Sequence, residues 1–341
     1  MKVLVTGAAG FIGFFVSKKL AEKGHEVVGL DNINDYYDVN LKYARLNELG
    51  IKKDDAEQFN VLTKSTTSTS FSFIRLALED RENLPNLFKA QNFDVVCNLA
   101  AQAGVRYSLE NPEAYVDSNL VGFLNILECC RNYKIKHLTY ASSSSVYGLN
   151  EQVPFKTSDQ VDHPVSLYAA TKKSNELMAH TYSHLYKFQC TGLRFFTVYG
   201  PWGRPDMAYY SFTNNILANK PINVYNNGKL ARDFTYIDDI VDGISLIIEK
   251  GYIPNSNTKS NASVYNIGRG KPIKLMDFIK TIELNLNKKA DLIMMPMQDG
   301  DVFKTWADTT ELSENYNYSP KINLEEGVGN FTKWYLRYQN Q

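Results

Sequence analysis

A glycine-rich turn between a short apolar strand and a helix constrains this chain most strongly. KVLVT (2–6) is a β-branched run, GAAGFIG (7–13) follows it at once, and FFVSKKLAEKG (14–24) carries apolar residues at helical spacing. A second strand-like run, HEVVGLD (25–31), closes on Asp31. Glycine lets the backbone turn tightly and approach a pyrophosphate, which then lies at the positive N-terminus of the helix. The unit predicts a dinucleotide-binding βαβ fold.

The residues of this unit make up a predicted cofactor site. An acid at the end of the second strand suits hydrogen bonding to an adenosine ribose, and its charge repels a 2′-phosphate. The predicted cofactor is therefore NAD rather than NADP. The residues expected to contact it here are Gly7, Gly10, Phe11, Ile12, Gly13, Asp31 and Asn32.

Strand-like and helix-like runs alternate through the first two thirds of the chain. Strands are expected at 71–78, 94–100, 136–142 and 189–196, and the main helices at 112–132 and 167–187, while TKSTTSTS (63–70) is expected to be a surface loop. This alternation predicts an α/β fold with a doubly wound parallel (Rossmann) sheet and a smaller mixed α/β C-terminal substrate lobe. The predicted Rossmann domain covers 1–196, with 232–267 returning to it, and the lobe covers 197–231 and 268–341.

The composition excludes several classes of function. Lys plus Arg and Asp plus Glu both number 37, so the chain lacks the basic excess typical of nucleic-acid binding. No apolar run approaches the roughly 18 residues that span a bilayer. The first predicted strand begins at Lys2, which leaves no room for a leader, and we expect a cytoplasmic protein.

Cysteine and histidine spacing gives no sign of a metal site. His180 and His184 share one helix face, but no third ligand accompanies them. The cysteines lack CxxC spacing and are expected to be small buried hydrophobes in a reducing compartment. They are Cys97, Cys129, Cys130 and Cys190.

Two further motifs carry chemistry. ASSSSVYG (141–148) puts four consecutive hydroxyls after an apolar run, and SLYAATKKSNE (166–176) puts Tyr168 and Lys172 four residues apart on one helix face. A tyrosine with a pKa near 10 is a poor base at neutral pH, so a nearby ammonium is expected to favour its phenolate.

The glycine turn, the serine row and the YxxxK pair together resemble the extended short-chain dehydrogenase/reductase family, in its nucleotide-sugar epimerase and dehydratase branch. DNINDYYDVNLKYARL, NLAAQAGVRYSLENP and GLRFFTVYGPWGRPDMA resemble the UDP-glucuronate 4-epimerases of that branch, and the likeness covers essentially the whole chain. The resemblance implies that Tyr168 removes the proton of the sugar C4 hydroxyl while hydride leaves for NAD, that Lys172 holds the nicotinamide ribose, and that Ser143 bonds to O4. The 4-keto sugar then turns, and hydride returns to its other face.

The serine row carries the expectation about the substrate. Dehydratase and decarboxylase relatives have one or two acids directly before VYG, whereas this chain has Ser144 and Ser145 there. Together with Thr197 they would form a hydroxyl ring for a C6 carboxylate, and Arg204 would brace the sugar or its acid end. Fixing the carboxylate would also keep a 4-keto uronate, a β-keto acid, from losing CO₂.

The remaining site residues are carried over from the resemblance. Tyr225 should stack near the uracil, Arg232 should bind the diphosphate, Asp301 should reach a ribose hydroxyl, and Arg106 should point toward substrate or cofactor phosphates. The family commonly has an Asp where this chain has Ala77, so adenine is expected to pair with the backbone of Leu78. The other residues expected along NAD are Ala100, Ala101, Gln102 and Asn119, with Phe195 and Phe196 near the nicotinamide.

The predicted activity is therefore C4 epimerisation of UDP-glucuronate to UDP-galacturonate with tightly bound NAD, in a pathway to surface polysaccharides. The alternatives are a 4-epimerase of a UDP-N-acetylhexosaminuronate or of UDP-glucose and UDP-galactose, and, more distantly, a non-catalytic NAD-binding sensor or scaffold. The resemblance also implies a homodimer formed by the helices at 112–132 and 167–187.

Overall fold

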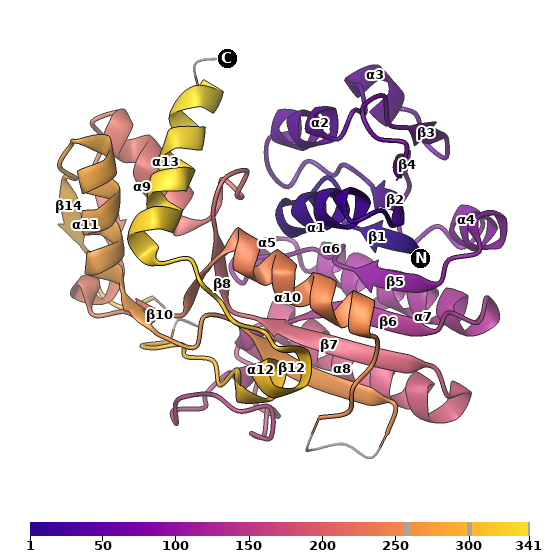
Figure 1. The fold of residues 1–341 in the computed structure, drawn as a ribbon. Helices are drawn as coiled ribbons and strands as arrows, with labels where there is room; N and C mark the ends of the chain where they lie inside the picture. Colours follow the sequence, from indigo (N-terminus) through magenta and orange to yellow (C-terminus); the bar gives the residue numbers. More distant parts are fainter. Residues whose placement is uncertain (256–259, 299–301, 340–341) are drawn as a thin grey trace.

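A mostly parallel sheet lies at the centre of the larger part of the molecule (Figure 1). The computed structural model describes residues 1–255, 260–298 and 302–339. The sheet has the strand order β12-β7-β6-β5-β1-β2-β4-β3, and every neighbouring pair is parallel except β3 with β4. The predicted doubly wound α/β fold is confirmed. The strands are β1 (Lys2–Thr6), β2 (Glu26–Asp31), β3 (Leu62–Lys64), β4 (Phe71–Arg75), β5 (Val95–Asn98), β6 (His137–Ser143), β7 (Gln189–Phe195) and β12 (Ala262–Ile267).

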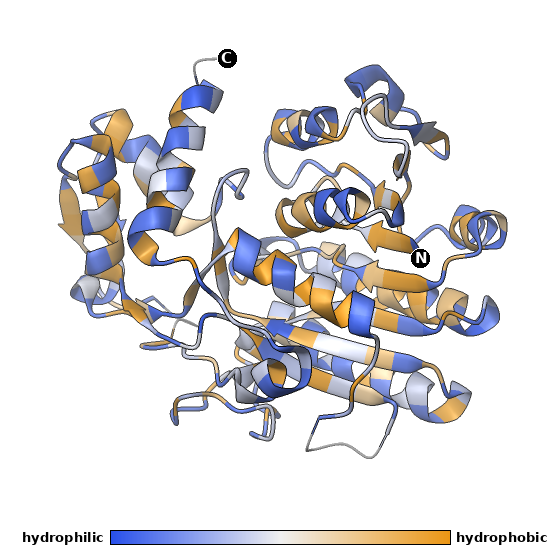
Figure 2. Cartoon of the chain, viewed as in Figure 1, coloured by the Kyte–Doolittle hydropathy of each residue, from blue (hydrophilic) through white to orange (hydrophobic). Residues whose placement is uncertain are grey.

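Helices cover both faces of this sheet because its strands are apolar on both sides. Val3 and Val5 of β1 belong to one buried cluster, and Leu4 between them belongs to another, as expected when side chains alternate along a strand. Figure 2 shows the apolar strands enclosed by helices with one polar face. One face is covered by α1 (Phe11–Glu22) and α10 (Ile237–Lys250), the other by α4 (Asn83–Gln91), α7 (Phe123–Asn132) and α8 (Leu167–Tyr186).

Two local predictions need correction. The helix expected over 112–132 is interrupted by a π-helical stretch, where Asn119 is held by hydrogen bonds to Gln102 rather than packed as a regular helix residue. Thr63 and Lys64, expected in a loop, pair with β4 as the antiparallel edge strand β3. The short elements of this half are α2 (Val39–Glu48), α3 (Lys53–Ala56), α5 (Tyr107–Glu110), α6 (Pro112–Tyr115), η1 (Val116–Gly122) and η2 (Ser144–Tyr147).

The C-terminal elements build a smaller lobe that stands beside the carboxyl ends of the sheet strands (Figure 1). Its interior is aromatic: Tyr209 packs edge-to-face on Phe331, and Tyr199 packs on Phe278. No helix of the described residues is long and apolar enough to cross a membrane. The remaining elements of the C-terminal part of the chain, of which α12 packs on α10 and β12 of the larger part (Figure 1), are β8 (Thr197–Tyr199), α9 (Ala208–Leu217), β9 (Ile222–Val224), η3 (Tyr225–Gly228), β10 (Ala231–Arg232), β11 (Phe234–Tyr236), β13 (Ile273–Lys274), α11 (Leu275–Leu286), β14 (Leu292–Met294), α12 (Thr310–Tyr316) and α13 (Leu324–Gln339).

Candidate active site

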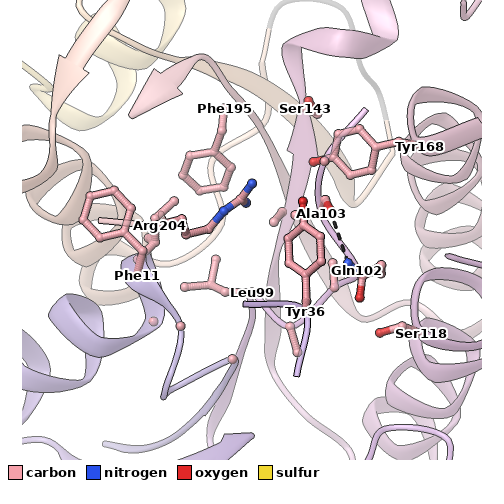
Figure 3. A pocket seen from close by; sticks show the side chains of 18 of the residues that line it. Phe11, Tyr36, Leu99, Gln102, Ala103, Ser118, Ser143, Tyr168, Phe195 and Arg204 are labelled. Carbon is pink, nitrogen blue, oxygen red and sulfur yellow. Dashed lines mark hydrogen bonds between the residues drawn. The ribbon is translucent and has the colours of Figure 1, made fainter. Parts of the chain in front are cut away.

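A cavity of about 440 Å³ opens at the carboxyl ends of the parallel strands (Figure 3). Ligands of open α/β sheets bind at this edge, because the loops that follow the strands converge there. Most of the sequence-predicted site residues line it. They are Gly7, Gly10, Phe11, Ile12, Gly13, Asp31, Asn32, Leu78, Ala100, Ala101, Gln102, Ser143, Ser144, Ser145, Tyr168, Lys172, Phe195, Thr197 and Arg204, and Phe196 joins them.

The glycine turn has the geometry that a dinucleotide needs. Gly7 has a φ of +72°, and the Gly10 amide donates to its carbonyl at 2.9 Å. A Cβ at Gly13 would overlap that same carbonyl oxygen, so only glycine lets α1 begin this close to the turn. No side chain caps α1, which leaves its first amides to face an anion. These residues fit the diphosphate of a dinucleotide.

Asp31 is held at the end of β2 by backbone donors. Its Oδ2 accepts from the Ala9 amide at 3.1 Å and its Oδ1 from the Ile33 amide at 2.8 Å. The carboxylate is fixed beside the glycine turn and borders the cavity, where its remaining lone pairs can meet ribose hydroxyls.

Gln102 and Leu78, both predicted to contact NAD, lie in backbone segments that buried asparagines hold in place. Asn119 lies behind the cavity lining and is buried, and it holds Gln102 by accepting from the Gln102 amide at 2.8 Å and donating to its carbonyl at 3.0 Å. Asn125 of α7 donates to the Leu78 carbonyl at 2.9 Å. The backbone at both positions is therefore fixed by buried asparagines.

Tyr168 and Ser143 lie side by side at the cavity (Figure 3), and Lys172 lines the same cavity. Ser166 caps α8 by accepting from the Ala169 amide at 3.1 Å, which places Tyr168 in the first turn. Burial raises the pKa of Tyr168, while the neighbouring Ser143 hydroxyl and the charge of Arg204 lower that pKa. The ammonium of Lys172 donates to the Ala141 carbonyl at 2.9 Å, and burial lowers its pKa to about 8.

Hydroxyls and cations surround the end of the cavity near Tyr168. Ser143 accepts from the Ser145 amide at 3.1 Å and so begins η2, while the hydroxyls of Ser144 and Thr197 have no hydrogen bond among the described residues. The only carboxylates among the described lining residues lie at the cofactor end: Asp31 is the last residue of β2, and Glu79 lies in the loop after β4. The local field therefore favours an anionic group beside the serines.

Arg204 enters the cavity from the side opposite Tyr168 and Ser143 (Figure 3). Its Nε and one terminal nitrogen donate to Asp206 at 3.0 and 2.6 Å, and the Tyr36 hydroxyl donates to the same carboxylate at 3.2 Å. Burial opposes the charge of Asp206, but Arg204 holds the pKa of that carboxyl below its usual value. The guanidinium is thus held in a fixed orientation with one terminal nitrogen uncommitted to Asp206.

The predicted nucleotide contacts lie outside the cavity lining. Arg106 stands 5.4 Å from the centre of the Tyr225 ring, so these two predicted residues meet, although 119 positions separate them by number. Arg232 donates to the carbonyls of Ala231 and Phe303 at 3.1 and 3.3 Å. Asp301 lies outside the described residues.

No group of three metal-ligating side chains occurs among the described residues, and His180 and His184 are exposed on α8. Sequence reasoning missed several lining residues, including Tyr36, Tyr37, Lys42 and Met207. The first three follow Asp31 closely in DNINDYYDVNLK, so their position just after a cofactor strand could have indicated them.

Comparison with known proteins agrees with this geometry. Residues 3–268 match the NAD dependent epimerase/dehydratase family. The chain is 50% identical over 348 residues to the protein CapI of Staphylococcus aureus, with 99% of each chain covered. It is 45% identical over 349 residues to a probable UDP-glucuronate 4-epimerase of Rhizobium meliloti (strain 1021), covering 98% of this chain and 97% of that one.

A solved structure shows the same fold over the same extent. It is the UDP-glucuronic acid 4-epimerase of Bacillus cereus in complex with UDP-glucuronic acid and NAD, with a TM-score of 0.85 and 31% identity, covering 99% of this chain and 100% of that one. The glycine turn, the Tyr168–Lys172 pair and these likenesses lead to one conclusion: the chain belongs to the NAD-dependent epimerase/dehydratase family.

Proposed function

We propose that this protein interconverts UDP-glucuronate and UDP-galacturonate by inverting C4 of the sugar, with NAD retained through the cycle. The observation that carries the proposal is the position of the Tyr168, Lys172 and Ser143 triad beside a cavity end that has hydroxyls and cations but no acid among its described lining residues. Relatives named as UDP-glucuronate 4-epimerases, of bacterial and plant origin, support it.

The residues that would hold NAD follow the cavity from the glycine turn to Tyr168. The α1 N-terminus would bind the diphosphate, Asp31 the adenosine ribose, and Lys172 the nicotinamide ribose. When bound there, NAD would supply a hydride acceptor for C4, and its positive charge would favour the Tyr168 phenolate. Lys172 is buried, and its bond to the Ala141 carbonyl holds the ammonium at this end of the site.

Proton transfer is assigned to Tyr168. Its phenolate takes the proton of the C4 hydroxyl as the C4–H bond breaks, and it returns that proton when the 4-keto sugar is reduced from its other face. Ser143 lies beside the Tyr168 phenol at the cavity, where it can bond to O4 (Figure 3). Epimerisation needs no acid for water elimination, which agrees with Ser144 and Ser145 before Val146.

The carboxylate of the uronate is assigned to Ser144, Ser145 and Thr197. All three border the cavity, and the uncommitted hydroxyls of Ser144 and Thr197 can donate to it. Loss of CO₂ from the 4-keto intermediate requires the C5–carboxylate bond to align with the π system of the C4 carbonyl. Hydrogen bonds that hold the carboxylate away from this alignment would suppress that loss.

The nucleotide end is assigned to Tyr225, Arg106 and Arg232. The Arg106–Tyr225 contact offers an aromatic face and a cation close together, as binding of uracil and diphosphate requires. Asp301 is kept as the proposed ribose contact on the strength of the family resemblance alone.

A homodimer completes the proposal. Leu177 and Leu185, two turns apart on α8, are 57% and 58% exposed, which is costly for a pair of leucines on one helix face. A second copy packed on this face, with α7 beside it, would bury them in a four-helix bundle.

We also propose a cytoplasmic enzyme that supplies galacturonate units for surface polysaccharides.

The test is an assay of purified protein with UDP-glucuronate, UDP-N-acetylglucosamine and UDP-glucose, followed by NMR without added cofactor. UDP-galacturonate should form from UDP-glucuronate faster than either other sugar is converted, and denatured protein should release NAD. Turnover that requires added NAD in proportion to product, or a preference for UDP-glucose, would contradict the proposal.

A further inference from the structure

Three consecutive residues at the end of β6 face three successive turns of α8. Tyr168, Lys172 and Glu176 lie four residues apart, so they share one face of the helix. Lys172 donates to the Ala141 carbonyl at 2.9 Å, the Ser142 hydroxyl donates to Glu176 at 2.6 Å, and Ser143 lies beside Tyr168 at the cavity (Figure 3). Two hydrogen bonds therefore fix the register of the strand on the helix next to Ser143.

Glu176 is the buried anchor of this arrangement. It is 7% exposed, and both its oxygens accept from Arg194 of β7, at 2.8 and 2.9 Å. Arg194 is 3% exposed and stands beside Ser142 in the β6–β7 register, so one carboxylate joins α8, β6 and β7. The two hydrogen bonds from Arg194 and the one from Ser142 offset much of the hydration that the Glu176 carboxylate loses on burial.

Arg194, the partner of Glu176, also contacts Tyr147, which follows the serine row. The guanidinium of Arg194 lies 4.9 Å from the centre of the Tyr147 ring, and the Tyr147 hydroxyl donates to Asn266 of β12 at 2.6 Å. Asn266 is the register neighbour of Arg194 on the next strand. Residues 142–147, which include the proposed carboxylate-binding serines, are thus fixed at both ends by groups around Glu176.

We propose that Glu176 is a positioning residue for proton transfer: acting through Ser142, it holds the end of β6 against α8 so that the Ser143 hydroxyl stays beside the hydroxyl of Tyr168 (Figure 3). This rests on the proposed function, since it assigns Tyr168 and Ser143 the proton-transfer role. Ser142 then differs from its neighbours in the row, because its hydroxyl is used by Glu176 and not by the sugar.

The consequence is a specific effect on Tyr168. The Ser143 hydroxyl lowers the pKa of Tyr168 against the effect of burial, so moving that hydroxyl away from Tyr168 raises the pKa. Removing the Ser142 hydroxyl leaves every other polar group near Tyr168 in place. Those groups are Lys172 on α8, Tyr115 on α6, and Arg204 in the loop before α9.

The experiment measures pH–rate profiles of Ser142→Ala, Ser143→Ala and the double variant as purified holoenzymes. Ser142→Ala should move the acidic limb of kcat to higher pH by about half a unit to one unit, with KM for the UDP-sugar unchanged. At neutral pH, kcat should fall about three- to tenfold, and the difference should shrink above the limb, where Tyr168 is ionised in both proteins. In the Ser143→Ala background, Ser142→Ala should have no further effect on the limb.

Glu176→Asp tests the anchor itself, because it keeps a charge for Arg194 but withdraws the carboxylate from Ser142. It should shift the acidic limb as Ser142→Ala does, and combining the two should add nothing. If this variant does not fold, the comparison of Ser142→Ala, Ser143→Ala and the double variant tests the proposal by itself. The control is Thr139→Val on the same strand, which removes a buried hydroxyl with no hydrogen-bond partner among the described residues and should leave the profile unchanged.

Three results would overturn the inference. They are an unshifted acidic limb in Ser142→Ala, an equal shift with and without Ser143, and a raised KM at unchanged kcat, which would mean that Ser142 contacts the sugar. A wild type that converts none of the UDP-sugars would instead refute the proposed function, so the two failures are distinguishable.

Discussion

The guanidinium of Arg45 donates two hydrogen bonds to the carbonyl of Trp202, at 3.0 and 2.7 Å, although 157 positions separate the two residues. Arg45 is fully buried, and its remaining terminal nitrogen donates to the Ala9 carbonyl in the glycine turn at 2.8 Å. One side chain therefore connects the proposed diphosphate site to the loop that carries Arg204. The cofactor half and the sugar half of the site share this anchor.

Arg204 should influence the pH dependence of the reaction. Its charge lowers the pKa of Tyr168, so Arg204→Gln should raise that pKa and move the acidic limb of kcat/KM to higher pH. The sign follows because the base is active when deprotonated, and a higher pKa requires a higher pH. Arg337→Gln, an exposed arginine on α13, is the control that should show no shift. A limb that moves to lower pH would contradict this interaction.

Tyr168→Phe should lower kcat by at least about a hundredfold, since it removes the proposed general base. Affinity for UDP and the amount of bound NAD should remain, because the ring still packs against Tyr115. Isothermal titration calorimetry measures the affinity for UDP, and the absorbance of NAD released on denaturation measures the amount of bound cofactor. Tyr43→Phe on α2 serves as the control, and near-normal turnover by Tyr168→Phe would remove Tyr168 from the mechanism.

Thr197→Val should damage turnover of the acidic sugar selectively. The change keeps the shape of the side chain and deletes the proposed donor to the carboxylate, a charge-assisted bond worth about tenfold or more in kcat/KM for UDP-glucuronate. Turnover of UDP-glucose in the same variant is the internal control and should change little. NMR should also detect more of the pentose by-product of CO₂ loss. Equal losses on both sugars would show that Thr197 does not recognise the acid.

Leu177→Glu together with Leu185→Glu should produce a monomer. Two carboxylates at the centre of an apolar helix–helix contact would lose their hydration on association. The free energy of this desolvation exceeds the free energy gained by burying the apolar contact. Sedimentation velocity at micromolar concentration should show a dimer for the wild type and a monomer for the variant. Leu284→Glu, at an equally exposed leucine on α11, should leave the dimer intact. A monomeric wild type would refute the proposed assembly.

Local patterns were enough to predict the fold and the cofactor. The Gly7–Gly13 turn followed by Asp31 largely determines its own conformation, because Gly10 and Gly13 leave room for the Gly7 carbonyl and the strand, turn and helix follow one another in consecutive residues. The doubly wound sheet followed from the alternation of apolar strands and helices, and the family assignment confirms the prediction of an NAD-dependent enzyme.

Contacts between distant segments were less accessible to local patterns. The π-helical stretch around Asn119 could not be foreseen, since it depends on hydrogen bonds with Gln102, which follows a different strand. Likewise, the pairing of Arg106 with Tyr225 joins two residues that the sequence suggested for separate reasons.

The serine row shows where the sequence alone stops. By itself, the sequence determined that four hydroxyls with no acid among them follow a buried strand, and so it excluded the acid that water elimination needs. Only the tertiary structure divided those hydroxyls between Glu176, Tyr168 and the open cavity, because that division depends on how β6 lies against α8 and β7. Strand–helix register is set by side chains more than thirty residues away, and a local pattern of serines carries no information about them.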